Sequence, residues 1–253
     1  MHISIVGSGN VAWHIAQAVL GAKHVVDSIA SRTPEHAQAL ARAVGASCCS
    51  VQYLPTTSDV YIVAVADDAI AQVVAQLPHN FQGVVAHTSG ATHIDILSAF
   101  DNYGVLYPCQ TISQNTQLNY ARLPFFVEGN NDTSLSTLKN LAQSISELVS
   151  TVSSEQRSYL HVAAVMSGNF TNHLLLLTQQ YMQSHGLNFD MLQPLMEQTI
   201  AKAFSTNPLS AQTGPARRHD EATLAIHRQL LTDENMLAIY NMLTRSIEKT
   251  YNK

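Results

Sequence analysis

The sequence has few charged residues. Asp, Glu, Lys and Arg make up only 12% of its 253 residues, which is about half the usual share of a globular protein. A surface so poor in charge predicts that a second subunit covers part of it. The formal net charge of −5 argues against binding to nucleic acid or to an anionic membrane, because both would need a basic surface.

Cysteines and long apolar runs are also scarce. The three cysteines, Cys48, Cys49 and Cys109, have no spacing typical of a disulfide framework or of a metal site. No apolar run reaches the ~18 residues of a membrane span, and the most apolar stretch is broken at Ser167-Gly168-Asn169. A strand pattern begins at the N-terminus, so we expect no signal peptide and a soluble, cytoplasmic protein.

The strongest motif is the first strand and the turn after it. Ile3 to Val6 has the pattern of a buried strand, and Gly7 to Ala12 fits the dinucleotide-binding turn. Gly7 permits the tight turn, Gly9 lets the backbone approach a pyrophosphate, and Ala12 lets the next helix lie close to the strand. The free N–H groups of that helix would face the phosphates. A structural Gly-rich turn is the alternative, but the context of strand and helix favours nucleotide binding.

The end of the second predicted strand, residues 24–30, indicates which nucleotide is bound. NAD-binding proteins place a carboxylate there for the ribose 2′-hydroxyl, whereas NADP-binding proteins offer Arg and hydroxyl groups to the 2′-phosphate. This strand ends in Ser31, Arg32 and Thr33, which predicts NADP. Asp27 competes for the role from inside the strand, and a solvated Arg32 with no ligand is the other alternative.

Strands and helices alternate up to about residue 150. This order predicts an α/β fold with a doubly wound parallel sheet, whose ligands bind at the carboxyl ends of the strands. The further strands are expected over residues 47–51, 60–65, 83–86, 105–107 and 124–128, and the helices over 35–44, 68–77, 91–100 and 135–148. The residues predicted to contact the cofactor at this edge are Gly7, Ser8, Gly9, Asn10, Val11, Ser31, Arg32, Thr33, Val65, Ala66, Asp67, Thr88 and Ser89.

After Val152 the pattern becomes helical. Ser153 and Gln156 form a capping box, from which one long helix runs to about residue 184, followed by helices over 191–204, 221–231 and 234–251. We therefore expect a Rossmann domain over residues 1–152 and an all-helical domain over residues 153–253. The long helix has no Asp, Glu, Lys or Arg between Arg157 and Asp190. Such a helix is normally buried around most of its girth, so we expect a homodimer formed by the helical domain.

Four motifs carry a resemblance to a known family. They are His87-Thr88-Ser89-Gly90, Tyr107-Pro108-Cys109-Gln110-Thr111-Ile112-Ser113, Asn169-Phe170-Thr171-Asn172-His173 and Gln212-Thr213-Gly214-Pro215-Ala216-Arg217. In this order they resemble a family that joins a Rossmann-like domain to domain of unknown function 2520. Its order of domains is similar to that of pyrroline-5-carboxylate reductase and of the wider 6-phosphogluconate dehydrogenase-like superfamily. The resemblance implies an NADP-dependent oxidoreductase with an unassigned substrate, and pairing through the helical domain.

One departure limits the resemblance. The hydroxyacid dehydrogenases of the superfamily carry a Lys on the long helix, but the stretch Gly168 to Asn172 has a Gly and Asn residues and no Lys. Their mechanism therefore does not transfer. Asn169, Asn172 and His173 are neighbours on this apolar helix, where they would bind substrate or cap other helices. His173 can also exchange a proton near neutral pH.

Three further residues are candidates for catalysis. His87 lies at the carboxyl end of a strand on the cofactor edge, where it would act on substrate or simply pack. Lys202 is the only lysine of the helical region before Lys249, and a solvated Lys is its alternative. Arg217 follows Gly214-Pro215 and would clamp a substrate anion or bind a helix C-terminus.

Two classes of function remain open from the sequence. The first is an oxidoreductase that passes hydride between NADP and a small imine, oxo or hydroxy acid-type substrate, with the active site between the His87–Gly90 loop and the long helix. In this hypothesis His173 or Lys202 donates the proton, Asn172 orients the substrate and Arg217 holds its anion. The second class is a non-catalytic NADP-binding or interaction protein on the same fold. No metal is expected in either.

Overall fold

The computed structural model describes residues 1–252. The chain forms two compact units, unit 1 (Met1–Phe170) and unit 2 (Thr171–Lys253). Unit 1 contains the whole sheet, and the described part of unit 2 is helical. The division between the units falls inside the long helix, because the first turns of that helix pack into unit 1 through the buried Arg157.

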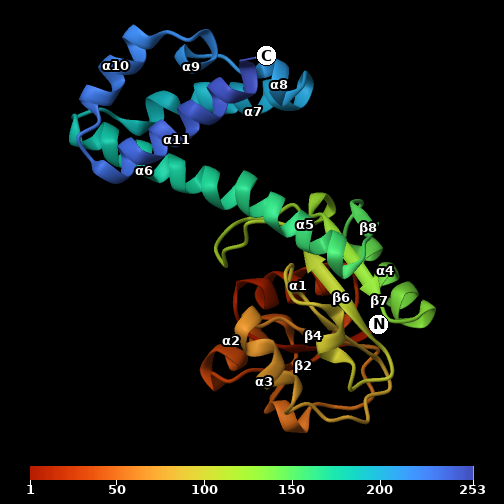
Figure 1. Cartoon of the computed structure of the whole chain (residues 1–253). Coiled ribbons are helices and arrows are strands. Elements are labelled where there is room, and N and C mark those ends of the chain that lie inside the picture. The colour runs from red at the N-terminus through yellow and green to blue at the C-terminus, as the bar shows by residue number, and fades with distance from the viewer. Residues whose placement is uncertain (253) are drawn as a thin grey trace. The chain divides into compact units, whose positions relative to one another are not determined.

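Unit 1 is built on an eight-stranded sheet with the order β3-β2-β1-β4-β5-β6-β7-β8 (Figure 1). The strands are β1 (His2–Val6), β2 (Val25–Ala30), β3 (Ser47–Cys49), β4 (Val60–Val63), β5 (Val84–His87), β6 (Tyr103–Pro108), β7 (Phe125–Gly129) and β8 (Val149–Thr151). All neighbours are parallel except β6 and β7. The link between β6 and β7 contains no crossover helix, so the chain returns antiparallel. The predicted doubly wound, Rossmann-type α/β fold is confirmed.

Helices cover both faces of this sheet. On one face, α1 (Asn10–Gly21), α2 (Pro34–Val44) and α4 (Asp132–Ile145) pack on the larger apolar core. On the other face, α3 (Ile70–Val74) and the 3₁₀ helix η3 (Ile94–Leu97) pack on a second core. The first strand supplies both cores, since Ile3 and Ile5 face one of them and Val6 the other.

The helix predicted over residues 91–100 is wrong, because only η3 forms there. Ser89 binds the first N–H groups of this segment as an N-cap would, but the N–H of Ile94 bonds to a distant side chain and not to a backbone carbonyl of a helical turn. The Ser89 hydroxyl accepts hydrogen bonds from the N–H groups of Ala91 and Thr92, at 3.1 and 2.9 Å. The Ser154 hydroxyl accepts another from Ile94 N–H, at 3.1 Å. The chain therefore wraps around Ser89 before it reaches η3.

The long helix forms as predicted but is not regular. It consists of α5 (Ser154–Ala164), a π-helical turn η5 (Val165–Asn169) and α6 (Phe170–Ser184). The capping box of Ser153 and Gln156 is present at its start. The π turn contains Gly168, which packs toward Thr111 of the loop after β6. Turns of this kind are frequent at functional sites.

Unit 2 continues with α7 (Gln193–Ser205), α8 (Pro208–Ala211), α9 (Pro215–Arg218), α10 (Glu221–Leu230) and α11 (Glu234–Tyr251). The expectation that the long helix is buried around most of its girth is wrong for the single chain. Met166, at 61% exposed, and Phe170, at 57%, belong to a row of exposed apolar side chains on it.

Candidate functional site

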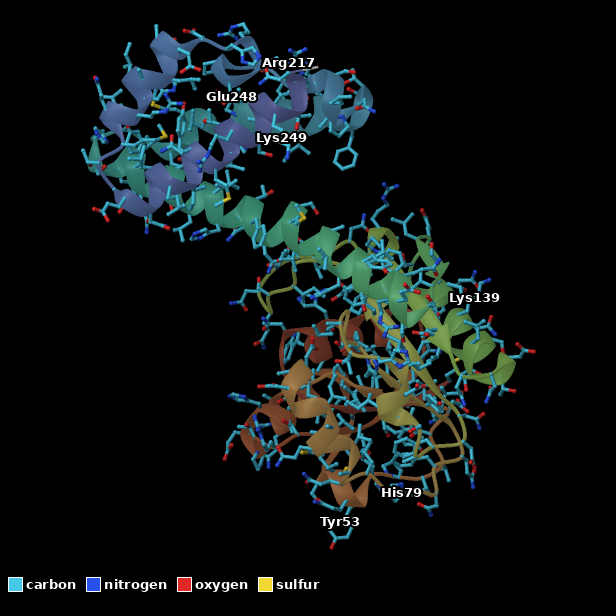
Figure 2. The ribbon with its side chains drawn as sticks, in the orientation of Figure 1. Tyr53, His79, Lys139, Arg217, Glu248 and Lys249 are labelled. Atoms are coloured by element: carbon cyan, nitrogen blue, oxygen red, sulfur yellow. The ribbon has the colours of Figure 1, made fainter. Side chains whose placement is uncertain are left out.

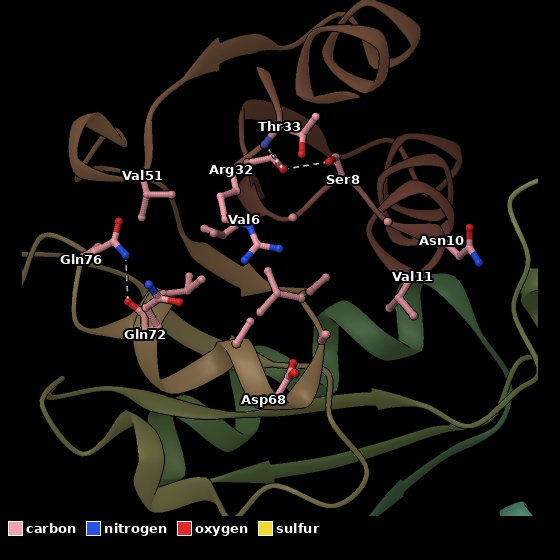
Figure 3. Close-up of a pocket in the computed structure, with 18 of the residues that line it drawn as sticks. Val6, Ser8, Asn10, Val11, Arg32, Thr33, Val51, Asp68, Gln72 and Gln76 are labelled. Carbon is pink, nitrogen blue, oxygen red and sulfur yellow. Dashed lines mark hydrogen bonds between the residues drawn. The ribbon is translucent and has the colours of Figure 1, made fainter. Parts of the chain in front are cut away.

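A cleft of about 750 Å³ lies at the carboxyl ends of β1, β2 and β4 (Figure 3). Most residues predicted to bind the cofactor line it, namely Gly7, Ser8, Gly9, Asn10, Val11, Ser31, Arg32, Thr33, Val65 and Ala66. Asp67, Thr88 and Ser89 are not part of this lining, and Asp68 lines it in place of Asp67. The sequence therefore located the cleft and most of its wall.

Two glycines shape the floor of the cleft in different ways. Gly7 has a φ of +128°, and a Cβ on it would lie 2.1 Å from the carbonyl oxygen of Ala64. Any larger residue would therefore strain the backbone and collide with it. Gly9 precedes α1, and a Cβ there would have no neighbour within 4 Å. No side chain caps α1, so the N–H groups of its first turn remain available to an anion.

The end of β2 presents Arg32 to the cleft. Figure 3 shows its guanidinium pointing into the cleft, between the loop after β1 and the segment that carries Asp68. The Ser31 hydroxyl is hydrogen-bonded to the Ser8 hydroxyl at 2.8 Å, which joins the two loops. Arg32 forms no ion pair among residues 1–252. It is therefore an exposed cation with no protein partner at the position that distinguishes NADP from NAD.

Asp27 is not part of this cleft. Its carboxylate accepts hydrogen bonds from the His2 ring and the Ser58 hydroxyl, both at 2.7 Å. It lines a separate hollow with His2 and Cys49. The alternative in which Asp27 binds a ribose hydroxyl at the cofactor cleft is therefore not supported by its position.

His87 lies at the carboxyl end of β5 and is fully buried. Its Nδ1 accepts a hydrogen bond from Ser89 N–H at 3.2 Å, so the ring proton is on Nε2, which has no partner in residues 1–252. Burial, and then the positive charge of Arg157, lower the pKa of His87 to about 3. His87 is consequently neutral at neutral pH and cannot act there as an imidazolium acid.

Arg157 is a buried residue that the sequence analysis did not single out. Its side chain is fully buried and forms an ion pair with Glu128 of β7. It also donates hydrogen bonds to the carbonyl of Thr92 and to the hydroxyl of Ser154, the latter at 3.1 Å. The Glu128 carboxylate in turn accepts from Ser154 N–H and from its hydroxyl, both at 2.8 Å. This network fixes the start of α5 to β7 and to the loop after His87.

A second pair of polar side chains lies at the end of β6. The hydroxyl of Tyr107 is 3.1 Å from Nδ1 of His161 on α5, and the rings meet edge to face, with centroids 5.9 Å apart. Gly90 packs against both, because a Cβ on it would lie 2.5 Å from His161 Nδ1. The sequence analysis identified Tyr107 only as part of a family motif and missed His161. No local sequence signal points to His161, because its partner lies 54 residues away along the chain.

The remaining predicted catalytic residues belong to unit 2. Asn172 and His173 are exposed on α6, and Lys202 is half-buried on α7. Arg217, labelled in Figure 2, belongs to α9, and its guanidinium lies 4.2 Å from the ring centroid of Tyr251. Arg217 therefore already has an aromatic partner. The catalytic roles of these four residues remain predictions.

Two kinds of site have no support among residues 1–252. No group of three or more His, Cys, Asp or Glu side chains could hold a metal ion. None of the helices described combines the length and apolar character that a membrane span requires.

The fold and the cleft define a Rossmann-type dinucleotide-binding protein with a helical second unit. Residues 2–86 match the family described as NADP oxidoreductase coenzyme F420-dependent, and residues 123–247 match the domain of unknown function DUF2520. The chain is 33% identical to "putative NADP oxidoreductase BF3122" from Bacteroides fragilis, over 98% of each chain and with a TM-score of 0.90. The chain belongs to this family, in which an NADP oxidoreductase domain is joined to DUF2520, and its cofactor is NADP.

More distant solved structures share the fold. The 1-pyrroline-5-carboxylate reductase of Streptococcus pyogenes is 15% identical, with a TM-score of 0.66, over 100% of this chain and 99% of that one. An imine reductase from Myxococcus stipitatus, in complex with NADP⁺, is 14% identical, with a TM-score of 0.68, over 98% and 94%. None of the curated proteins compared with the chain matches it.

The cleft fits NADP. The uncapped start of α1 and the side-chain-free surface at Gly9 suit a pyrophosphate. Arg32 and the hydroxyls of Ser31 and Thr33 suit a 2′-phosphate. The cofactor, when bound, supplies or accepts the hydride.

Proposed function

We propose that this protein is an NADP-dependent oxidoreductase that transfers hydride between the nicotinamide and a small imine, oxo or hydroxy acid-type substrate. The observation that carries the proposal is the order of groups along one sheet edge. The cleft occupies the ends of β2, β1 and β4, and the next strands end in His87 and the Tyr107–His161 pair. The names of the distant neighbours, which include reductases of imines, favour a C=N or C=O substrate.

A non-catalytic NADP-binding protein is the second candidate function, because fold alone does not fix activity. The polar groups at the ends of β5 and β6, His87 and the Tyr107–His161 pair, favour the enzyme. A protein that only binds NADP would not need a hydrogen-bonded tyrosine and histidine at this position. NADPH oxidation, followed with a panel of imines and 2-oxo acids, separates the two. The enzyme consumes NADPH with at least one member of the panel, and the binding protein consumes it with none.

Arg32 is proposed to select NADP over NAD by contacting the 2′-phosphate. One charge-assisted contact is worth about 1.5–3 kcal/mol, so NADPH should bind at least about tenfold more tightly than NADH. Arg32→Ala should remove most of this difference, whereas Arg42→Ala, exposed on α2 outside the cleft lining, should preserve it. Calorimetric titration measures both affinities. Equal affinities in the wild type would contradict the assignment.

The proposal includes a homodimer formed by the helical unit. Across the described part of unit 2, the only buried apolar residues are Met182, Ala216 and Leu224, while Phe204 is 90% exposed and Leu195 is 60% exposed. So little buried apolar surface cannot offset the conformational entropy of ordering this many residues. A second copy of the chain would supply the missing cover, as in obligate dimers, whose interfaces resemble a divided core.

Light scattering at micromolar concentration should therefore give the mass of two chains. Replacing Phe204 and Leu195 with Lys should shift the protein toward the monomer, because two charges would be buried without partners. Tyr53→Lys is the matched control: Tyr53 is 82% exposed and points outward from unit 1 in Figure 2. A wild-type monomer would sink the dimer proposal.

A further inference from the structure

The Tyr107–His161 pair is placed where the nicotinamide half of the cofactor has to lie. The strands run in the order β2-β1-β4-β5-β6, and all five are parallel, so their carboxyl ends share one edge. The cleft with Arg32 covers the first three of these ends. A dinucleotide that begins at β2 and crosses β1 therefore directs its other half toward β5 and β6. Tyr107 is near the end of β6.

The loop after β6 connects this pair to the cleft. Ile112 lines the cleft, and its carbonyl accepts a hydrogen bond from the Asn10 side chain at 3.2 Å. Ile112 is five positions after Tyr107, and an extended chain spans at most about 3.6 Å per residue. Tyr107 is therefore held within roughly 18 Å of the cleft wall, and β5 is the only strand between β6 and the cleft strand β4.

Tyr107 and His161 differ in their access to solvent, as a proton relay requires. Tyr107 is only 8% exposed, whereas His161 is half-buried and in reach of solvent. Burial, and then Cys109 and Asp67, raise the pKa of Tyr107, so its hydroxyl stays protonated until a strongly basic atom beside it takes the proton. His87, the other imidazole at this edge, is fully buried and neutral, with its Nδ1 bound to Ser89. Of the imidazoles of His87 and His161, only that of His161 is in reach of solvent water, with which it can exchange a proton.

We propose that Tyr107 is the catalytic proton donor of the reduction and that His161 reprotonates it, an inference that rests on the proposed oxidoreductase function. The substrate carbon of C=N or C=O accepts the hydride, with its electron pair, from NADPH, and the π pair moves to the substrate nitrogen or oxygen. That atom takes the proton of the Tyr107 hydroxyl. The Tyr107 oxygen takes the proton on His161 Nδ1, and solvent water returns a proton to that nitrogen. In the oxidative direction the same steps run in reverse.

The test compares Tyr107→Phe with Tyr103→Phe, the same change on the same strand. Loss of an acid–base group costs about 10²–10⁴-fold in turnover, so Tyr107→Phe should lose kcat in this range and still bind NADPH like the wild type. Tyr103→Phe should keep the wild-type kcat. His161→Gly should lose kcat and recover part of it with added imidazole. A purely structural role for His161 predicts no such rescue.

A second readout needs no substrate. In protein with ¹⁵N-labelled histidine, the Nδ1 resonance of His161 should shift in Tyr107→Phe and stay unchanged in Tyr103→Phe, with NADP⁺ bound or absent. If the wild type turns over and Tyr107→Phe retains its kcat within about threefold, the relay is wrong and the oxidoreductase proposal stands. If no member of the substrate panel is reduced by the wild type, while NADPH binds, both proposals are overturned.

Discussion

Replacing Arg157 with Ala should lower the free energy of unfolding of this protein by about 3–5 kcal/mol, the cost of removing one partner from a buried ion pair. Glu128, whose side chain is only 16% exposed, would be left with no cation beside it. Ser154 and the carbonyl of Thr92 would also lose a donor. The loss should appear in urea unfolding as a lower midpoint with little change of slope.

The matched control is Arg228→Ala. Arg228 pairs with Glu221 at 3.7 Å, but its side chain is 37% exposed and that of Glu221 is 69% exposed. Exposed pairs contribute about 0–1 kcal/mol, so the control should stay within about 1 kcal/mol of the wild type. Comparable losses in the two variants would contradict the view that the Arg157 network anchors α5 to the sheet.

Gly7→Ala and Gly9→Ala should separate the fold from nucleotide binding. Gly7→Ala should cost roughly 2–5 kcal/mol, because it adds backbone strain at a φ of +128° to a collision with the Ala64 carbonyl. Gly9→Ala has open space and should cost no more than about 1 kcal/mol. Its added methyl would project where a phosphate approaches, so NADPH affinity should fall at least about tenfold.

Thermal or urea unfolding and NADPH titration give both quantities for each variant. The expected pattern is a destabilised Gly7→Ala protein and a stable Gly9→Ala protein that binds poorly. If Gly9→Ala binds NADPH like the wild type, the pyrophosphate does not cross the start of α1, and the placement of the cofactor is wrong.

The sequence predicted the lining of the cleft well because that part of the site is local. The turn after β1 depends on Gly7 and Gly9, which are adjacent to the strand and helix that they join. Likewise, Ser31 to Thr33 follow directly from the end of β2. Local rules of turn geometry and helix termini therefore locate these residues without knowledge of the tertiary fold.

The rest of the site depends on contacts between distant segments. Arg157 meets Glu128 and Thr92 across 29 and 65 residues of sequence, and Tyr107 meets His161 across 54. Nothing in the local pattern of these residues indicates a partner so far away. The helix expected over 91–100 failed for the same reason, since Ser154, 60 residues further along the chain, takes a hydrogen bond from Ile94.

The burial predicted for the long helix is not reached within one chain, because low charge indicates that a surface is covered but not what covers it. The row that includes Met166 and Phe170 is exposed in one chain. Its cover is assigned here to a second copy of the protein. A second copy on this row would explain both the low charge of the long helix and the exposure of its apolar side chains in a single chain.

The reaction is proposed to take place at the carboxyl ends of β5 and β6. A crystal structure of the wild-type protein with NADP⁺ tests this claim most directly and needs no known substrate. We expect C4 of the nicotinamide within about 8 Å of the Tyr107 hydroxyl, the length of a small substrate plus a hydrogen bond. A nicotinamide farther than this from Tyr107, His161 and every catalytic residue predicted from the sequence would contradict the account.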